Sequence, residues 1–356
     1  MTAPSAPSSP RFLRNTWYIA AWASELATGT LLPRRLLDEP VVLWRDTSGA
    51  VHALLDRCPH RFAPLSMGRL MADGSLQCGY HGLQFDAGGR CTVNPQGDGT
   101  VPKAAQVTAY PVVERHTAVW IWMGDPARAD ATRIPDYSLF SRQPHEGYRT
   151  FDGMFTVQAA YELEIDNLMD LSHPEFLHAG SLGSPAQKTA HYKAWQEGDT
   201  TVHSNRWFDE GPCPAAMEVA FPTEGKPVEH WTHMRWDAPS LLWLHVGVTF
   251  TGQPREAGMN TWSAHFLTPE TEGSTHYFYN HTRRFALDSA EVDEGIRAMV
   301  LHAFLQEDRP MLEAIQRDMG GRDLWSMKPV LLSGDSGGVR ARRLLEKLIA
   351  GEHAAA

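Results

Sequence analysis

The chain has 356 residues, of which 42% are hydrophobic and 21% are charged, and its formal net charge is −10. This length corresponds to about two domains, and the composition excludes both a disulfide-rich miniprotein and a disordered chain. The acidic balance lacks the basic bias that a phosphate backbone attracts, so we expect no nucleic acid partner.

The four cysteines, Cys58, Cys78, Cys91 and Cys213, are too few and too unevenly placed for a disulfide framework. We interpret them as ligands or buried thiols in a reducing compartment, which makes the cytoplasm the expected location. Residues 1–10 are rich in Pro, Ser and Ala, show no signal-peptide pattern and are predicted to form a flexible tail. No apolar stretch approaches the ~18 residues of a membrane span, so no membrane contact is expected.

Short segments rich in β-branched and aromatic residues dominate residues 11–135. Clusters of Gly, Asp and Pro separate them, which is typical of antiparallel strands joined by turns. The segments comprise residues 16–22, 40–45, 51–56, 76–85 and 117–124. We therefore predict a small antiparallel β domain, with a boundary near Pro135 where the apolar periodicity is lost.

A mixed pattern follows over residues 136–356. Helices are predicted over residues 159–178, 290–319 and 338–352, and strands over residues 200–208, 240–250, 260–268 and 274–283. Pro310 is expected to kink the second helix or to restart it just after Asp308. The predicted fold class is α+β.

Two short loops each carry one cysteine and one histidine. Cys58 and His60 form a C-x-H pair, and Cys78 and His81 form a C-x2-H pair after 17 intervening residues. Two thiolates and two imidazoles suit tetrahedral zinc or a Rieske [2Fe-2S] cluster, in which the cysteines hold one iron and the histidines the other. Zinc fingers place cysteines together and histidines together, whereas each loop here mixes them, so the spacing favours the Rieske cluster.

A second group of candidate ligands is predicted further along the chain. His173 and His178 are separated by about 140° on an ideal helix, and Pro174 is expected to break that helix so that both imidazoles reach one ion. Asp308 is the expected carboxylate of a 2-His-1-carboxylate iron(II) site with open positions for dioxygen and substrate, and Glu307 is the alternative.

Two polar residues precede these histidines. Asp170 lies three residues before His173, so on a helix its carboxylate lies on the same side as that imidazole and is expected to accept a hydrogen bond from its N–H. A plain surface aspartate is the alternative. Asn167, one turn earlier, faces the iron or merely packs.

These motifs resemble the oxygenase components of Rieske non-haem iron oxygenases, and most closely the dicamba and vanillate O-demethylase group. The resemblance runs from RNTWYIAAW through CPHRFAPLS, CGYHGLQFD, WIWMGDP and IDNLMDLSHPEFLH to the terminal RLLEKL. It implies an N-terminal Rieske antiparallel β domain and a C-terminal catalytic domain, residues 136–356, with a curved antiparallel sheet flanked by helices. It also implies a head-to-tail homotrimer, in which Asp170 connects His173 to His81 of the partner subunit.

The resemblance further implies a monooxygenase that takes electrons from NAD(P)H through a separate flavin or iron–sulfur reductase. Dioxygen would hydroxylate a methyl or methoxy substituent of an aromatic acid, and a hydroxylated methoxy group collapses to a phenol and formaldehyde. The alternatives within the class are methyl hydroxylation of toluene-type carboxylates or sulfonates, and ring hydroxylation. Outside the class they are an electron-transfer Rieske protein, for which the second domain would be superfluous, and a zinc-stabilised binding module.

Five residues of the predicted sheet are candidate substrate contacts. His265 matches a substrate-contacting position of the dicamba-type enzymes and is the expected polar anchor, with His245 as a second candidate. Trp243, Leu244 and Phe266 are expected to line the ring pocket, with a core position as the alternative for each. The dicamba-type enzymes have an asparagine near the position of Leu244, which argues against an unmodified dicamba specificity.

Overall fold

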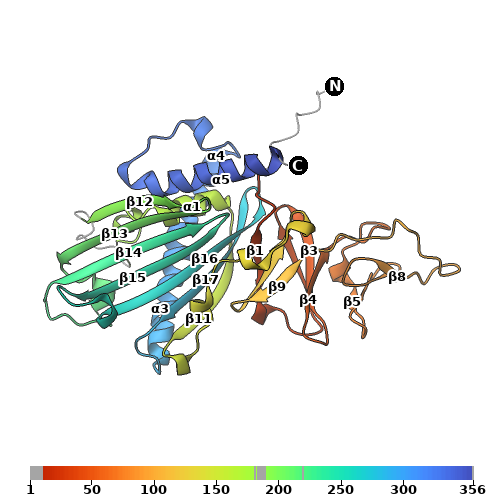
Figure 1. Ribbon diagram of the computed structural model, residues 1–356, viewed down its shortest axis with the longest axis horizontal. Coiled ribbons are helices and arrows are strands. Elements are labelled where there is room, and N and C mark those ends of the chain that lie inside the picture. The colour runs from red at the N-terminus through yellow and green to blue at the C-terminus, as the bar shows by residue number, and fades with distance from the viewer. Residues whose placement is uncertain (1–10, 180–181, 183–189, 219, 355–356) are drawn as a thin grey trace. The chain divides into compact units, whose positions relative to one another are not determined.

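The computed structural model of the chain describes residues 11–179, 182, 190–218 and 220–354, drawn in Figure 1. The predicted tail, residues 1–10, lies outside the described residues. The chain forms two compact units, the N-terminal unit (Arg14–Asp136 with Thr268–Thr271) and the C-terminal unit (Met1–Leu13, Tyr137–Leu267 and Glu272–Ala356). The division is therefore discontinuous in sequence, whereas the sequence analysis expected a single boundary. The limits 11–135 and 136–356 remain a prediction for separately folding domains.

The N-terminal unit consists of three small antiparallel sheets. Their strands, in spatial order, are β1 (Trp17–Trp22), β10 (Ala118–Trp122) and β9 (Val112–Arg115); β2 (Leu31–Leu36), β3 (Glu39–Arg45) and β4 (Val51–Leu55); and β5 (Arg69–Leu70), β6 (Leu76–Gln77), β7 (Gln84–Phe85) and β8 (Cys91–Val93). All residues of β1 and β10 are buried, which explains why these segments read as continuous apolar runs.

A seven-stranded antiparallel sheet forms the centre of the C-terminal unit (Figure 1). In spatial order its strands are β11 (Arg149–Val157), β17 (Ser274–Arg283), β16 (Met259–Thr271), β15 (Leu241–Phe250), β14 (Val228–Asp237), β13 (Thr201–Gly211) and β12 (His191–Glu197). β16 begins in the C-terminal unit, and its last residues belong to the N-terminal unit.

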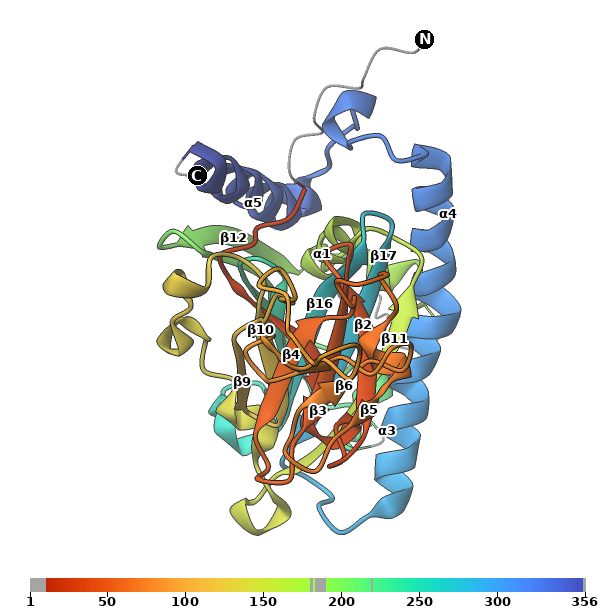
Figure 2. The same ribbon diagram turned by 90° about the vertical axis from the view of Figure 1, so that its right-hand side faces the viewer.

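Within the described residues, the α-helices that accompany this sheet are α1 (Tyr161–Met169), α2 (Ala215–Glu218), α3 (Ala290–His302), α4 (Arg309–Met319) and α5 (Ser336–Ala354). Figure 2 shows α3 and α4 as one long column beside β11 and β17. Short 3-10 turns cover Ala23–Glu25, Leu65–Met67, Pro126–Arg128, Ala131–Arg133, Ser138–Ser141, Pro144–Glu146, His173–Glu175, Arg255–Ala257, Trp325–Met327 and Ser333–Asp335. Of the helices in the described ranges, none is long and apolar enough to cross a membrane.

Two helix predictions have different outcomes. α4 begins at Arg309, with Pro310 in its first turn, so the predicted restart just after Asp308 is confirmed. The prediction of a helix through residue 178 is wrong, because α1 ends at Met169 and Asp170 adopts an extended backbone (φ −85°, ψ 100°). The chain leaves the helix four residues before Pro174, so the proline is not the cause of its end.

Candidate metal centres

The first candidate centre is formed by two loops of matching geometry in the N-terminal unit. In each loop the cysteine carbonyl accepts a hydrogen bond from the N–H four residues later, Phe62 to Cys58 at 2.9 Å and Gly82 to Cys78 at 3.0 Å. Phe62 and Gly82 both have a positive φ, 59° and 77°, and this left-handed turn brings the chain back past its own cysteine. The two loops therefore have the same backbone turn.

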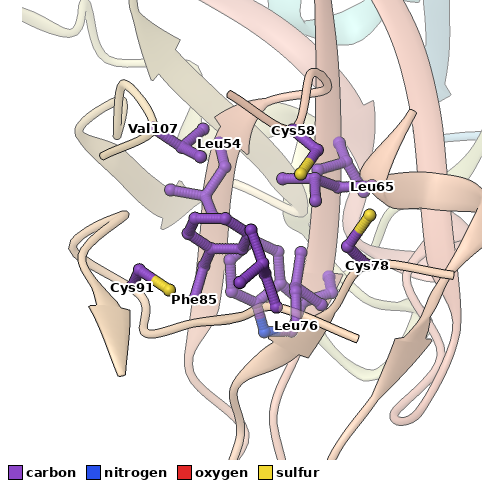
Figure 3. Packing of buried hydrophobic residues seen from close by; sticks show 11 residues of the cluster. Leu54, Cys58, Leu65, Leu76, Cys78, Phe85, Cys91 and Val107 are labelled. Carbon is purple, nitrogen blue, oxygen red and sulfur yellow. The ribbon is translucent and has the colours of Figure 1, made fainter. Parts of the chain in front are cut away.

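The two thiols face the interior and the two imidazoles face outward. Cys58 and Cys78 are buried at one end of the apolar core, whereas Cys91 lies on the other side of Phe85 (Figure 3). The rings of His60 and His81 are 4.5 Å apart between centroids, and His60 is exposed. Thus the two loops bring the predicted cysteine ligands to one end of the core and the predicted histidine ligands beside each other.

The donor set fits a metal cluster. Burial, together with the neighbouring Cys78, raises the pKa of the Cys58 thiol to about 11, so two adjacent thiolates need a cation beside them. Two buried sulfurs next to two outward imidazoles match a dinuclear iron–sulfur centre whose histidine-bound iron lies nearer the surface.

The second candidate centre brings together His173, His178 and Asp308, whose ligand atoms all lie within 4.8 Å of one another. The His178 Nε2 atom is 3.2 Å from Asp308 Oδ1, His173 Nε2 is 3.6 Å from that oxygen, and the two Nε2 atoms are 3.3 Å apart. Three ligands at right angles, each about 2.1 Å from one ion, would be ~3 Å apart. The triangle therefore fits a facial 2-His-1-carboxylate site.

Local backbone changes position all three side chains. The end of α1 and the 3-10 turn at His173–Glu175 direct both histidines to one side. Asp308 is the last residue of a π-helical segment, Ala303–Asp308, inserted between α3 and α4. A π-turn holds one more residue than an α-turn and is frequent at functional sites, and its wider turn carries the buried Asp308. Sequence periodicity alone did not reveal this segment.

Glu307, the alternative carboxylate, has a different place. Its Oε2 atom accepts a hydrogen bond from His178 Nδ1 at 2.8 Å, so it orients the imidazole from behind and lies outside the triangle of ligand atoms. Asn167 donates from Nδ2 to Asp308 Oδ1 at 3.0 Å, so it faces the centre. Burial opposes protonation of His178, but the carboxylates of Asp308 and Glu307 outweigh it and raise the pKa of this histidine.

The sequence analysis expected the Asp170 carboxylate to accept a hydrogen bond from His173, and this expectation is wrong. The main-chain carbonyl of Asp170 accepts from His173 Nδ1 at 2.6 Å, whereas the carboxylate Oδ1 accepts from the N–H and hydroxyl of Ser172 at 2.8 and 2.5 Å. The reason is that the helix ends before Asp170, so its side chain no longer projects along the face that carries His173.

The sequence analysis missed Glu164, which lies on α1 and is 2% exposed. It borders a narrow gap together with Asn167, Asp308, Tyr277 and Phe304. Burial, with Asp308 nearby, raises the pKa of this carboxyl to about 8. The available signal was an acidic residue between Leu163 and Ile165, two positions that read as apolar.

The sheet register separates the candidate substrate contacts into two groups. Directly paired residues share a face of an antiparallel sheet, and faces alternate along each strand. Leu244 pairs with Ser263, two residues before His265, so Leu244 and His265 share one face. The ring of His265 lies 5.5 Å from that of Phe304 in the π-segment, which identifies this as the face of the metal triangle.

Trp243, His245 and Phe266 point to the opposite face. Trp243 packs on Phe140, and His245 stacks on Trp262 and lies 2.8 Å from Asn260 Oδ1. Trp243 and Phe266, two of the three expected ring-pocket residues, and His245, the second candidate anchor, therefore do not share the face of His265, because each is an odd number of residues from His265 or Leu244 on its own strand. Trp243 and Phe266 take the alternative core position instead.

Replacement of Glu307 by glutamine is expected to lower the affinity of the second centre for Fe(II) by about 10- to 100-fold, because the amide is a weaker acceptor for His178 Nδ1–H. Competition with a ferrous chelator measures this loss. Glu294→Gln, an exposed carboxylate on α3, is the matched control. An affinity equal to that of the control would show that Glu307 does not orient His178.

Comparison with known proteins covers both centres. A Rieske [2Fe-2S] domain matches residues 16–111, and a vanillate O-demethylase oxygenase C-terminal domain matches residues 157–351. The chain is 41% identical over 342 residues to the oxygenase component of chloroacetanilide N-alkylformylase of Rhizorhabdus wittichii, which covers 96% of this chain and 97% of that protein. It is 40% identical over 340 residues to the oxygenase component of dicamba O-demethylase of Stenotrophomonas maltophilia, with 95% and 98% covered.

A crystal structure of dicamba monooxygenase with non-heme iron and dicamba matches this fold with a TM-score of 0.82 at 40% identity, over 97% of this chain and 99% of that one. The predicted fold class and the predicted cofactors, a Rieske [2Fe-2S] cluster and a mononuclear iron, are confirmed by these matches. The zinc and electron-carrier alternatives are thereby set aside. The chain belongs to the Rieske non-haem iron oxygenases, as an oxygenase component of the vanillate O-demethylase group.

Proposed function

We propose that this oxygenase uses dioxygen and electrons from a separate reductase to remove the methyl group of an aromatic methoxy compound, giving a phenol and formaldehyde. The observation that carries the proposal is the 3.2–3.6 Å triangle of His173, His178 and Asp308 in a chain that also has the two Cys–His loops. The relatives named dicamba O-demethylase and vanillate O-demethylase, 40% and 34% identical over nearly their whole length, support demethylation.

In this proposal Cys58 and Cys78 would hold one iron of the cluster, and His60 and His81 would hold the other. The buried thiols give the cluster a dry environment on one side. A cluster bound there would accept and pass on one electron at a time. Replacement of two thiolates by neutral rings also makes the cluster easier to reduce.

His173, His178 and Asp308 hold the mononuclear iron, which when bound supplies open coordination positions for dioxygen activation. The protein's own groups keep these ligands in place. Asn167 holds Asp308 Oδ1, Glu307 orients His178, and the Asp170 carbonyl orients His173. Each ligand therefore has a partner that limits its rotation.

Association of copies is proposed to connect the two metal types. Large apolar side chains near the cluster loops, Phe62, Met67 and Tyr80, are exposed. On the C-terminal unit, Phe176 and the segment Val330–Leu332 are exposed as well, and Gly334 lies beside the Asp170 carboxylate. Exposed apolar groups at both redox ends suit a homotrimer in which one subunit's cluster approaches the iron of the next.

Replacement of Asp170 by asparagine is expected to keep both metals bound and to slow electron transfer between them by at least about tenfold. The main-chain carbonyl still holds His173 Nδ1, but the side-chain amide is a weaker acceptor than the carboxylate for His81 of the partner subunit. Stopped-flow oxidation of the reduced cluster in a single turnover measures the rate. An unchanged rate would remove Asp170 from the electron path.

The function is tested by formaldehyde release from a panel of methoxybenzoates, with NADH, air and a reductase of the flavin and iron–sulfur type. Formaldehyde in equal amount to the phenol formed from one substrate is the expected result. Oxygen consumption without formaldehyde would overturn demethylation and direct the test to toluene-type carboxylates and sulfonates. None of the four cysteines, all within the described residues, forms a disulfide, which agrees with a cytoplasmic setting that we include in the proposal.

A further inference from the structure

Two buried histidines on neighbouring strands have the same arrangement. His265 on β16 places its Nδ1 atom 2.9 Å from the hydroxyl of Tyr277, and His281 on β17 places its Nδ1 atom 3.0 Å from the hydroxyl of Ser263. His265 is 1% exposed and His281 is 6% exposed. Each imidazole is thus held through one ring nitrogen by a hydroxyl from the adjacent strand.

Both imidazoles lie on the face of the sheet that carries the metal triangle. Ser263 and His265 are two residues apart on β16, and Tyr277 and His281 are four apart on β17, so all four share a face. Helical residues cover this row. Phe304 lies 5.4 Å from Tyr277 between ring centroids, and the Arg297 guanidinium of α3 lies 4.5 Å from the ring of Phe151, which pairs with His281.

The second ring nitrogen of each histidine, unlike the first, makes no hydrogen bond among the described residues. The Nε2 atoms of His265 and His281 are buried, and neither has a hydrogen-bond partner among the described residues. A buried polar atom without a partner is costly, and native proteins rarely keep one unless a ligand or water completes it. Two such atoms on one face, beside a metal site, point to a bound molecule that supplies their partners.

The hydroxyl groups determine what these nitrogens offer. Burial raises the pKa of Tyr277 well above its usual range, so its phenol stays protonated and donates to Nδ1 of His265. A serine hydroxyl can do the same for His281. Burial also lowers the pKa of His265 to about 3 and of His281 to about 4, so both rings are neutral near pH 7. Each Nε2 then carries the ring's single hydrogen and acts as a donor.

We infer that His281 is a second substrate-binding residue, and that the substrate is a methoxyarene with two further acceptor groups, one for Nε2–H of His265 and one for Nε2–H of His281. The inference rests on the proposed function and specifies its substrate class. Leu244, which pairs with Ser263 on this face, adds only apolar surface beside the two imidazoles.

The test measures dissociation constants by calorimetry on the full, metal-loaded protein. The probes are 3-methoxybenzoate and its three derivatives with one nitro group, at position 2, 4 or 5. The variants are His281→Leu, Ser263→Ala, which removes only the hydroxyl that holds Nδ1, and His276→Leu. His276 is the matched control because it lies on the same strand, is also 6% exposed, and points to the other face.

At least one nitro compound is expected to lose tenfold or more in affinity with His281→Leu and several-fold with Ser263→Ala, while 3-methoxybenzoate changes less than twofold. The role of His281 would be overturned if His281→Leu weakened the binding of 3-methoxybenzoate and of the nitro compounds equally. It would also be overturned if the loss of affinity were no larger than that of His276→Leu. If wild type still releases formaldehyde in that case, the proposed function stands without it. If wild type neither binds nor demethylates any probe, both the proposed function and this inference fail.

Discussion

Replacement of Asp308 by alanine is expected to reduce the iron content from about three to about two atoms per chain and to abolish turnover, with the cluster unaffected. Asp308 provides the one carboxylate in the triangle with His173 and His178. Without it, two neutral imidazoles remain, and these bind Fe(II) weakly. Iron analysis, together with visible absorbance of the cluster, measures the two metal pools separately.

The control for this variant is Asp318→Ala, an exposed carboxylate on the same helical column. It should keep all three iron atoms and full activity. An Asp308→Ala protein that retains the third iron would assign the carboxylate ligand to another residue, with Glu307 as the first to examine, since its Oε2 atom already contacts His178.

Replacement of His81 by alanine is expected to remove the visible absorbance of the cluster and all activity. His60 and His81 are the two imidazoles at the outward side of the candidate cluster, and a [2Fe-2S] centre that loses one of four ligands is open to solvent at that iron. Absorbance and electron paramagnetic resonance of the reduced protein provide the readout.

His52→Ala is a suitable control, because His52 lies in the same unit and pairs with Asp46 at 2.8 Å. It should leave the colour and the spectrum intact. A brown, active His81→Ala protein would contradict the assignment of His81 to the cluster.

The amino-acid sequence by itself determined the features that depend on short chain separations. The Cys58–His60 and Cys78–His81 spacings place one thiol and one imidazole in each loop, because a covalent connection of two or three residues leaves little freedom. The alternation of side chains along a strand and the effect of Pro310 on its helix also depend only on residues close in sequence. For this reason the two-part α+β fold and the restart of the helix at Arg309 were predicted correctly.

Only the tertiary structure decided the features that depend on long-range pairing. Asp308 and Glu307 are adjacent in sequence, and the π-turn alone directs the first into the triangle and the second to the back of His178. His265 and Phe266 are also adjacent, yet the sheet register points one toward the metal site and the other away from it. Because a shift of one residue inverts every side chain of a strand, composition and spacing cannot choose the face. The packing of the whole sheet against α1 and the π-segment makes that choice.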